Sequence, residues 1–237
     1  MRNELLEMKQ QLEEEHQEFN KEIDNLRIER QELSFESEFY SMAMEFVRKD
    51  EIPETLSREL YKITQDEMKQ IEEWTGKICR DVVFDSDYDN WSIEECVLNE
   101  RILGRRHLLF LIEDEDGEKF GYYLNTMINE YYYSWKPTDN ESFLFNLKSN
   151  GRLQQPMKFE IKDFSYGYKL ADQSSKWIIE FGNISLYTEN EKTSCNCWQN
   201  DNCFNYHGIE NALCGKEKNE YGFMYFIPKR ILIIQMI

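Results

Sequence analysis

The segment covering residues 108–147 constrains the fold more than any other part of the chain. It contains two apolar runs, 108–112 and 120–124, separated by the turn residues Asp116-Gly117. Glycine adopts the positive φ that tight turns require, so this pattern predicts a β-hairpin. Gly121 would let a neighbouring segment approach the backbone closely. Further along, Phe143-Leu144-Phe145 is apolar on both faces, which predicts a strand inside a sandwich.

The rest of the chain after residue 77 consists mainly of short apolar segments with turn signals between them. This spacing predicts an α+β, mainly β fold, an antiparallel β-sandwich with flanking helices. Besides the hairpin and the Phe143 strand, strands are predicted at 78–84, 159–164, 177–181, 184–187, 223–227 and 231–237. Two capping boxes predict helices: Thr64 with Glu67 begins one that ends near Gly76, and Ser92 with Glu95 begins another that reaches about Ile102.

Residues 1–50 contain no glycine or proline and carry a heptad pattern. One seam is apolar and aromatic throughout: Leu5, Leu12, Phe19, Leu26, Leu33, Tyr40 and Val47. The companion seam, four residues on, is mostly polar. This pattern predicts a long N-terminal helical arm that forms a homo-oligomeric coiled coil, packs on its own domain, or stays solvated. Pro53 should end the arm, leaving 51–63 as a hinge with a short helix and 64–237 as the domain.

The charge and composition exclude several classes of partner. A formal net charge of −18 argues against binding a nucleic-acid backbone or an anionic membrane surface, and it suits protein partners. The charged start of the chain is unlike a secretory signal, and the apolar run 231–234 is too short to span a bilayer. We therefore expect a cytoplasmic protein without a transmembrane segment. In such a reducing compartment its six cysteines would be free thiols.

The sequence offers one candidate metal site, in residues 195–214. Thiolate and imidazole are ligands that zinc prefers, and the candidates are Cys195, Cys197, Cys203, His207 and Cys214. Their spacing lacks the paired C-x2-C knuckles of typical zinc sites. Two other interpretations stay open: reversible oxidation of close thiols such as Cys195 and Cys197, or a polar loop with scattered reduced thiols.

Other candidate chemistry is sparse. Asp85, Asp87 and Asp89 alternate as in a calcium loop, but Asn90 and Cys96 occupy the positions that need glycine and glutamate, so a loop whose acids favour a helix N-terminus fits better. No nucleophile elbow, metalloprotease motif or phosphate-binding loop occurs, and no catalytic residue is predicted. The aromatic run 131–135 is either a partner-binding surface or half core and half rim.

The order of these features resembles the TLDc domain family. The matching residues are Asp116-Gly117, Phe120-Gly121, Trp135, Glu141-Ser142-Phe143-Leu144-Phe145, Tyr206 and Leu213-Cys214-Gly215, with a closing strand. The resemblance covers residues 64–237. It implies a β-sandwich that acts as a non-enzymatic protein-interaction module and needs no cofactor. It also implies a connection with resistance to oxidative stress and with regulation of the vacuolar proton-pumping ATPase, whose subunits would be partners.

Overall fold

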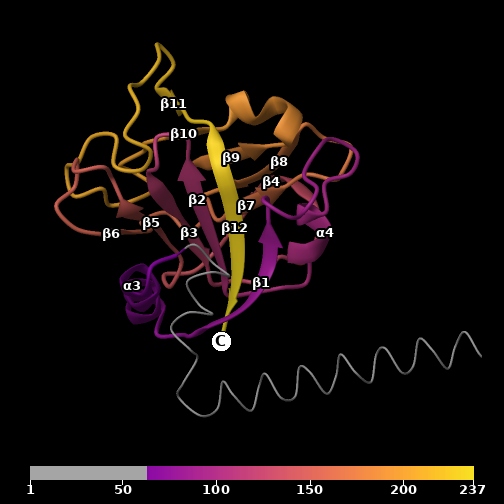
Figure 1. Cartoon of the computed structure of the whole chain (residues 1–237), viewed down its shortest axis with the longest axis horizontal. Coiled ribbons are helices and arrows are strands. Elements are labelled where there is room, and N and C mark those ends of the chain that lie inside the picture. Colours follow the sequence, from indigo (N-terminus) through magenta and orange to yellow (C-terminus); the bar gives the residue numbers. More distant parts are fainter. Residues whose placement is uncertain (1–62) are drawn as a thin grey trace, which may run out of the picture. The chain divides into compact units, whose positions relative to one another are not determined.

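Two six-stranded antiparallel sheets build the part of the chain that the computed structural model describes, residues 63–237 (Figure 1). The first sheet contains β1 (Cys79–Asp85), β12 (Pro228–Met236), β2 (Leu108–Asp114), β3 (Lys119–Leu124), β5 (Phe143–Lys148) and β6 (Met157–Glu160), in that order. The second contains β11 (Phe223–Tyr225), β10 (Asn196–Trp198), β9 (Ile184–Tyr187), β8 (Trp177–Phe181), β7 (Tyr168–Leu170) and β4 (Tyr132–Lys136). The predicted mainly β, two-sheet architecture is confirmed.

Three short helical elements accompany the sheets: α3 (Gln65–Thr75), α4 (Leu98–Ile102) and the 3₁₀ helix η1 (Glu189–Ser194). The predicted helical arm over 1–50 lies outside the described residues, as does almost all of the predicted hinge over 51–63. None of the helices within residues 63–237 is long and apolar enough to cross a membrane.

The predicted hairpin is confirmed as β2 and β3. Leu111 pairs with Gly121 in the antiparallel register, and Gly117 adopts a φ of +77° in the turn. A Cβ atom added at Gly121 would overlap the carbonyl oxygen of Phe110 and would lie 2.9 Å from the Phe145 ring. The absence of a side chain at this position is therefore a packing requirement of the first sheet.

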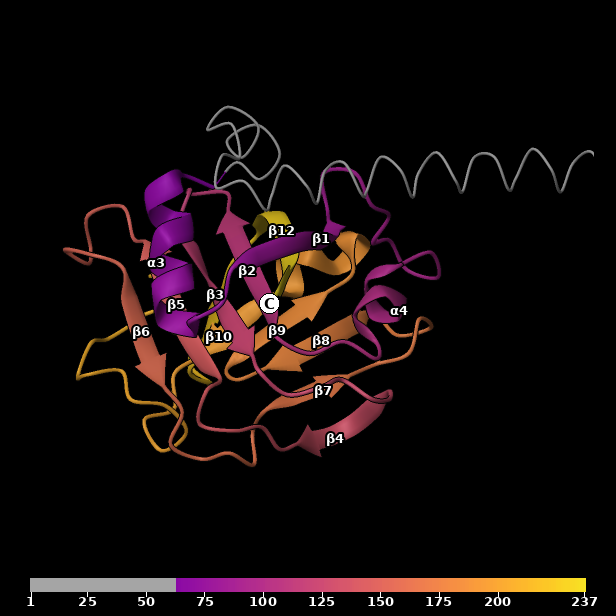
Figure 2. The ribbon, with the colours of Figure 1, turned by 90° about the horizontal axis from the view of Figure 1, so that it is seen from below.

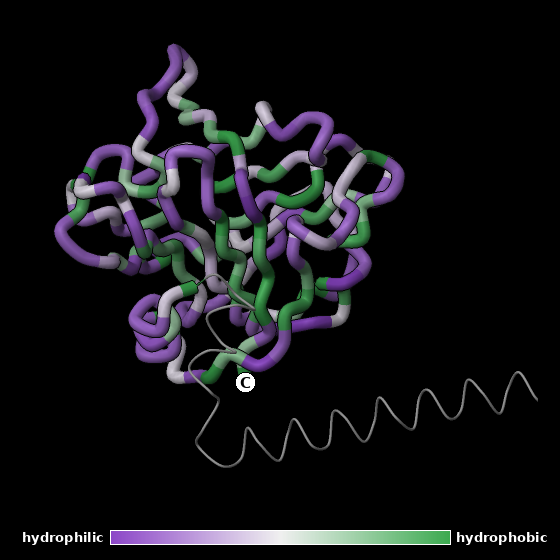
Figure 3. The backbone as a smooth tube through the Cα atoms, in the orientation of Figure 1, coloured by the Kyte–Doolittle hydropathy of each residue, from purple (hydrophilic) through white to green (hydrophobic). Residues whose placement is uncertain are grey.

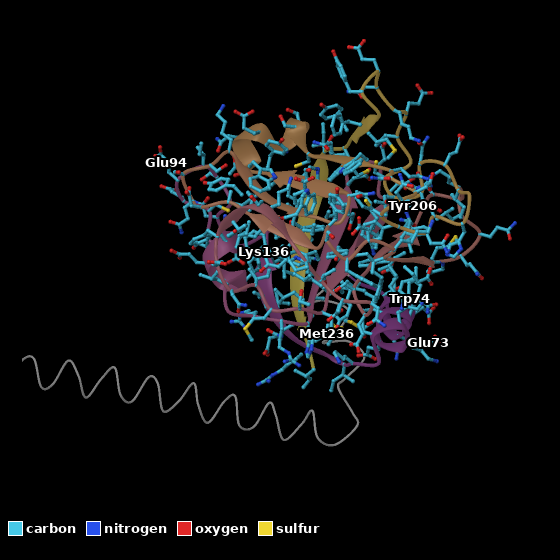
Figure 4. The ribbon with its side chains drawn as sticks, turned by 180° about the vertical axis from the view of Figure 1, so that it is seen from behind. Glu73, Trp74, Glu94, Lys136, Tyr206 and Met236 are labelled. Carbon is cyan, nitrogen blue, oxygen red and sulfur yellow. The ribbon has the colours of Figure 1, made fainter. Side chains whose placement is uncertain are left out.

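β5 is buried on both faces, as predicted, but the two faces have different covers. Leu144 points between the sheets, where it packs near Gly182 of the second sheet. Phe143 and Phe145 point the other way and contact Trp74 of α3, with ring centroids 6.2 and 6.3 Å apart. Figure 2 shows α3 lying over this face of the first sheet, and Figure 4 shows Trp74 on the side of α3 that faces the strands.

Aromatic rings join the two sheets at the centre of the core. Phe181 of β8 stacks on Phe110 of β2 and Tyr122 of β3, with centroid distances of 4.6 and 5.6 Å. Apolar positions gather along the central strands, whereas the loops at the rim are mostly polar (Figure 3). Rings from both sheets therefore stack on one another, and this stacking joins the inner faces of the two sheets.

Two predictions of local structure were wrong. The Ser92–Glu95 segment is a turn, and α4 begins only at Leu98, because Asn90 accepts hydrogen bonds from the Ser92 amide and hydroxyl groups and donates one to Glu95. The strand predicted at 159–164 is β6, which ends at Glu160. Beyond it the chain leaves β5 and makes a single bridge between Ile161 and Phe204.

The acidic loop after β1 is held by arginines. The Asp85 carboxylate accepts hydrogen bonds from Arg230 at 2.9 and 2.5 Å, and Asp89 pairs with Arg101 at 2.8 Å. Asp85 also accepts from the Asp87 amide, closing the turn. Asp85 and Asp89 therefore bind arginine side chains. The sequence had predicted only that the acids of this loop favour a helix N-terminus.

Candidate functional site

Cys197 and Cys214 form a buried thiol pair. Cys197 belongs to β10, where it pairs with Ile184 of β9 on one side and Met224 of β11 on the other. Cys214 lies in the 199–222 loop that connects β10 to β11. The two Sγ atoms are 3.0 Å apart, and both residues are at most 1% exposed. Sequence spacing had suggested Cys195 and Cys197 as close thiols, whereas the contact in the structure joins Cys197 to Cys214.

The other three candidate ligands have separate surroundings. The Cys195 sulfur is 3.4 Å from the Tyr187 amide, which donates to it. Cys203 is buried where the chain bridges Ile161 to Phe204, and His207 is exposed with its Nε2 3.4 Å from Glu160. Over residues 63–237, no three His, Cys, Asp or Glu side chains are grouped so as to hold a metal ion.

A polar cluster of Glu118, Asn146 and Arg152 anchors the loop next to Cys214. Asn146 and Arg152 both donate to the Leu213 carbonyl oxygen, at 2.7 and 3.0 Å, and Arg152 also donates to Glu118 at 2.6 Å. Gly215 adopts a φ of +68°, and a Cβ atom there would lie 2.5 Å from Arg152 Nε. The guanidinium group therefore packs tightly against the residue that follows Cys214.

Burial sets the acidity of Cys195 and Cys197. It raises the pKa of Cys195 to about 12 and raises the pKa of Cys197 well above the usual value for a thiol. The neighbouring Cys214 raises the pKa of Cys197 further, whereas the Arg152 charge lowers it by a smaller amount. Since the thiolate is the reactive form of cysteine, the closed domain keeps Cys197 unreactive.

The second sheet presents an aromatic face on the side that points away from the core. We define this aromatic face as Tyr133, Trp135, Trp177, Tyr187 and Tyr225. Tyr133 and Tyr225 are 61% and 48% exposed, and the other three are half-buried. Tyr133 lies against Trp177, with ring centroids 6.2 Å apart, and Trp177 pairs with Tyr187 across β8 and β9. β4 lies at the edge of this sheet in Figure 2.

Charged side chains hold the aromatic face in place. Lys169 lies between β4 and β8, with its Nζ 4.2 Å from the centre of the Trp135 ring and 2.8 Å from Glu180. The Tyr133 hydroxyl donates to Asp172 at 2.8 Å, and this bond raises the pKa of Tyr133. These contacts hold the Trp135 and Tyr133 side chains in place and leave Tyr133 exposed to solvent.

Comparison with known proteins identifies the family. A family model of the TLDc domain matches residues 52–224, well over half of the chain. The chain belongs to the TLDc domain family. A search of curated proteins found no match. The TLDc match includes the thiol pair, the Arg152 cluster and the whole aromatic face except Tyr225.

The TLDc sandwich of this chain also depends on a strand beyond the matched residues. β12 lies between β1 and β2 in the first sheet, and its apolar side chains are buried. The sequence identified one part of the aromatic face, the run at 131–135. It did not connect that run to Trp177, Tyr187 or Tyr225. Tyr187 and Tyr225 each follow a buried residue of their strand, whereas the register of β8 shifts between Trp177 and Ile179.

Proposed function

We propose that this TLDc protein is a non-enzymatic interaction module that binds a protein partner through its aromatic face. The observation that carries the proposal is the exposure of Tyr133 and Tyr225 on a sheet surface that also contains two tryptophans. Tyrosine and tryptophan are enriched at the centres of protein interfaces because they bury large areas while losing little side-chain entropy. Lys169 and Glu180 pair with each other there, so together they add no net charge to the aromatic face.

Membership of the TLDc family supports a more specific proposal. The partner belongs to the vacuolar proton-pumping ATPase, and the module contributes to resistance against oxidative stress in the cytoplasm. The net charge of −18 would favour a basic surface on that partner around an apolar centre. Association would then combine long-range attraction with short-range aromatic contacts.

Affinity capture tests the proposal directly. The full chain is immobilised and exposed to an extract of its native cells, and the retained proteins are identified by mass spectrometry. The double variant Tyr133→Ser with Trp177→Ser should weaken binding of the retained partner by about 30-fold, the loss expected for removing a hot spot worth about 2 kcal/mol. Subunits of the vacuolar ATPase should be among the proteins that wild type retains.

A matched control separates this surface from aromatic residues in general. Tyr88 is 80% exposed in the loop after β1 of the first sheet, and Tyr88→Ser should leave capture unchanged. The melting temperatures of all variants should be compared first. Equal capture by wild type and a folded aromatic-face variant would show that the partner binds elsewhere.

We also propose that residues 1–50 make the protein a homo-oligomer. The apolar seam in the sequence supports this, because seven successive positions at heptad spacing are apolar or aromatic. Multi-angle light scattering of the full chain should give a mass above the 28.8 kDa of one chain, and Leu12→Glu with Leu26→Glu should reduce it to that value. A monomeric mass for wild type would end the proposal.

A further inference from the structure

The arrangement of Cys197 and Cys214 points to a covalent modification site. We propose that these two residues form a reversible intramolecular disulfide when the protein meets a hydroperoxide. Their sulfur atoms are 3.0 Å apart, about 1 Å longer than the S–S bond of about 2.05 Å. All six cysteines of the chain are free thiols in this structure, so the bond would form from the reduced state described here.

The backbone around the pair makes the contact persistent. Cys197 is fixed in β10 by strands on both sides, β9 and β11. Cys214 is fixed by its neighbours, since Asn146 and Arg152 hold the Leu213 carbonyl oxygen and the Gly215 amide donates to Asn211 at 3.2 Å. A small approach of the two sulfur atoms suffices, and neither segment needs to change its register.

The redox step balances with a hydroperoxide as the oxidant. The Cys214 thiolate attacks the peroxide, the O–O bond breaks, and the products are a sulfenic acid at Cys214 and an alcohol, or water for hydrogen peroxide. The Cys197 thiol then loses its proton and attacks the sulfenic sulfur, forming the S–S bond and releasing water. Two electrons pass from the two sulfur atoms to the peroxide. Two equivalents of a small thiol reverse the process by thiol–disulfide exchange.

Access to the pair requires the 199–222 loop to open. Both thiols are at most 1% exposed, so peroxide does not reach them in the closed form. The loop is held against the first sheet by the bonds of Asn146 and Arg152 to Leu213, and opening breaks them together. Oxidation is therefore expected to be slow and to accelerate when those bonds are removed.

The disulfide would change the stability of the domain. The disulfide would close a loop of about 15 residues. The loop-closure entropy that such a bond removes from the unfolded chain should raise the melting temperature of a domain of this size by about 6 to 12 °C. The bridge would bind the 199–222 loop to β10 and so to the second sheet. This inference is independent of the aromatic face, since Cys197 points toward the core.

Mass spectrometry of the full chain tests the proposal. The reduced protein is treated with hydrogen peroxide, unfolded, and alkylated with N-ethylmaleimide. Wild type should retain four alkylated thiols instead of six, lose the mass of two hydrogen atoms, and yield a linked peptide containing Cys197 and Cys214. Dithiothreitol should restore all six. Asn146→Ala should speed the loss of the two thiols because it weakens the anchor of the loop.

Three cysteine variants make the result specific. Cys195→Ala leaves the pair intact and should still lose two thiols. Cys214→Ala lacks the attacking thiol and should keep all five of its thiols, whereas Cys197→Ala should give no linked peptide and should lose at most the Cys214 thiol, as a sulfenic acid. Where an alanine variant does not fold, the serine variant at the same position replaces it. A linked peptide that joins any other two cysteines, or six alkylated thiols after oxidation of both wild type and folded Asn146→Ala, would overturn the proposal.

Discussion

Replacing Arg230 by leucine should destabilise the domain more than any other single charge removal on β1 or β12. Arg230 donates two hydrogen bonds to Asp85, at 2.9 and 2.5 Å, and both side chains are 7% exposed. The pair joins the end of β1 to β12, the two outermost strands on one side of the first sheet. Without the arginine, a carboxylate would remain in a site that water barely reaches.

The magnitude follows from the cost of an unpaired buried charge. Removing one partner of a buried ion pair costs about 3–5 kcal/mol, a large part of the 5–15 kcal/mol that stabilises a typical domain. Asp85→Leu should cost less, because Asp87 remains 3.4 Å from the Arg230 guanidinium. The double variant removes both members of the buried pair, so its cost should fall short of the sum by at least about 2 kcal/mol.

Urea denaturation of the full-length protein measures these changes in the free energy of unfolding. They are calculated from the shifts in the midpoint urea concentration, with one slope for the dependence of free energy on urea. The control is Arg80→Leu in β1, the strand that contains Asp85, because Arg80 pairs with Asp81 at 3.1 Å but both side chains are about half exposed. Exposed pairs contribute about 0–1 kcal/mol. If Arg230→Leu cost no more than Arg80→Leu, or if the two single changes at Asp85 and Arg230 were additive, burial would not be what makes this pair matter.

Three further substitutions test other parts of the fold. Gly121→Ala should cost about 3 kcal/mol or more in urea denaturation, because the new Cβ overlaps the backbone of β2; an unchanged midpoint would contradict the register of β2 and β3. Trp74→Ala should cost about 2 kcal/mol and expose Phe143 and Phe145, with an increase in dye binding to apolar surface. Burial and the Arg106 charge lower the pKa of His107 in the folded protein. The stability of the domain should therefore fall as the pH decreases below 6.5 toward the pKa of the folded state. His107→Asn, which tolerates the φ of +55°, should abolish this pH dependence of the melting temperature.

The sequence predicted elements well where turn chemistry and burial agree. β8 and β9 have the bounds that were expected, because Gly182-Asn183 forms a two-residue turn between apolar runs and Gly182 adopts a φ of +54°. The β2–β3 hairpin was equally clear from Asp116-Gly117. In these segments the turn residues and the burial of the apolar side chains favour the same structure, so the strand bounds can be predicted from the segment itself.

Two short inner strands of the second sheet could not be predicted in this way. β7 and β10 have three residues each, which is too short for a period to be recognised. The Ser92–Glu95 pattern was misleading because a third residue, Asn90, bonds to both members of the expected capping box. In each case the local structure depends on a residue or strand outside the sequence motif, and only the tertiary structure shows where that residue or strand lies.

Both candidate sites arise from the path of the chain between the sheets. β4 enters the second sheet beside β7 because β5 and β6, which lie between them in sequence, pair in the first sheet. That crossing brings Tyr133 against Trp177. The loop from β10 to β11 likewise returns Cys214 to Cys197 only because the Arg152 cluster anchors it to the first sheet. The spacing of residues within one segment does not predict the Tyr133–Trp177 contact or the Cys197–Cys214 contact. The sequence supplies the thiols and the rings, and the topology determines which of them lie together.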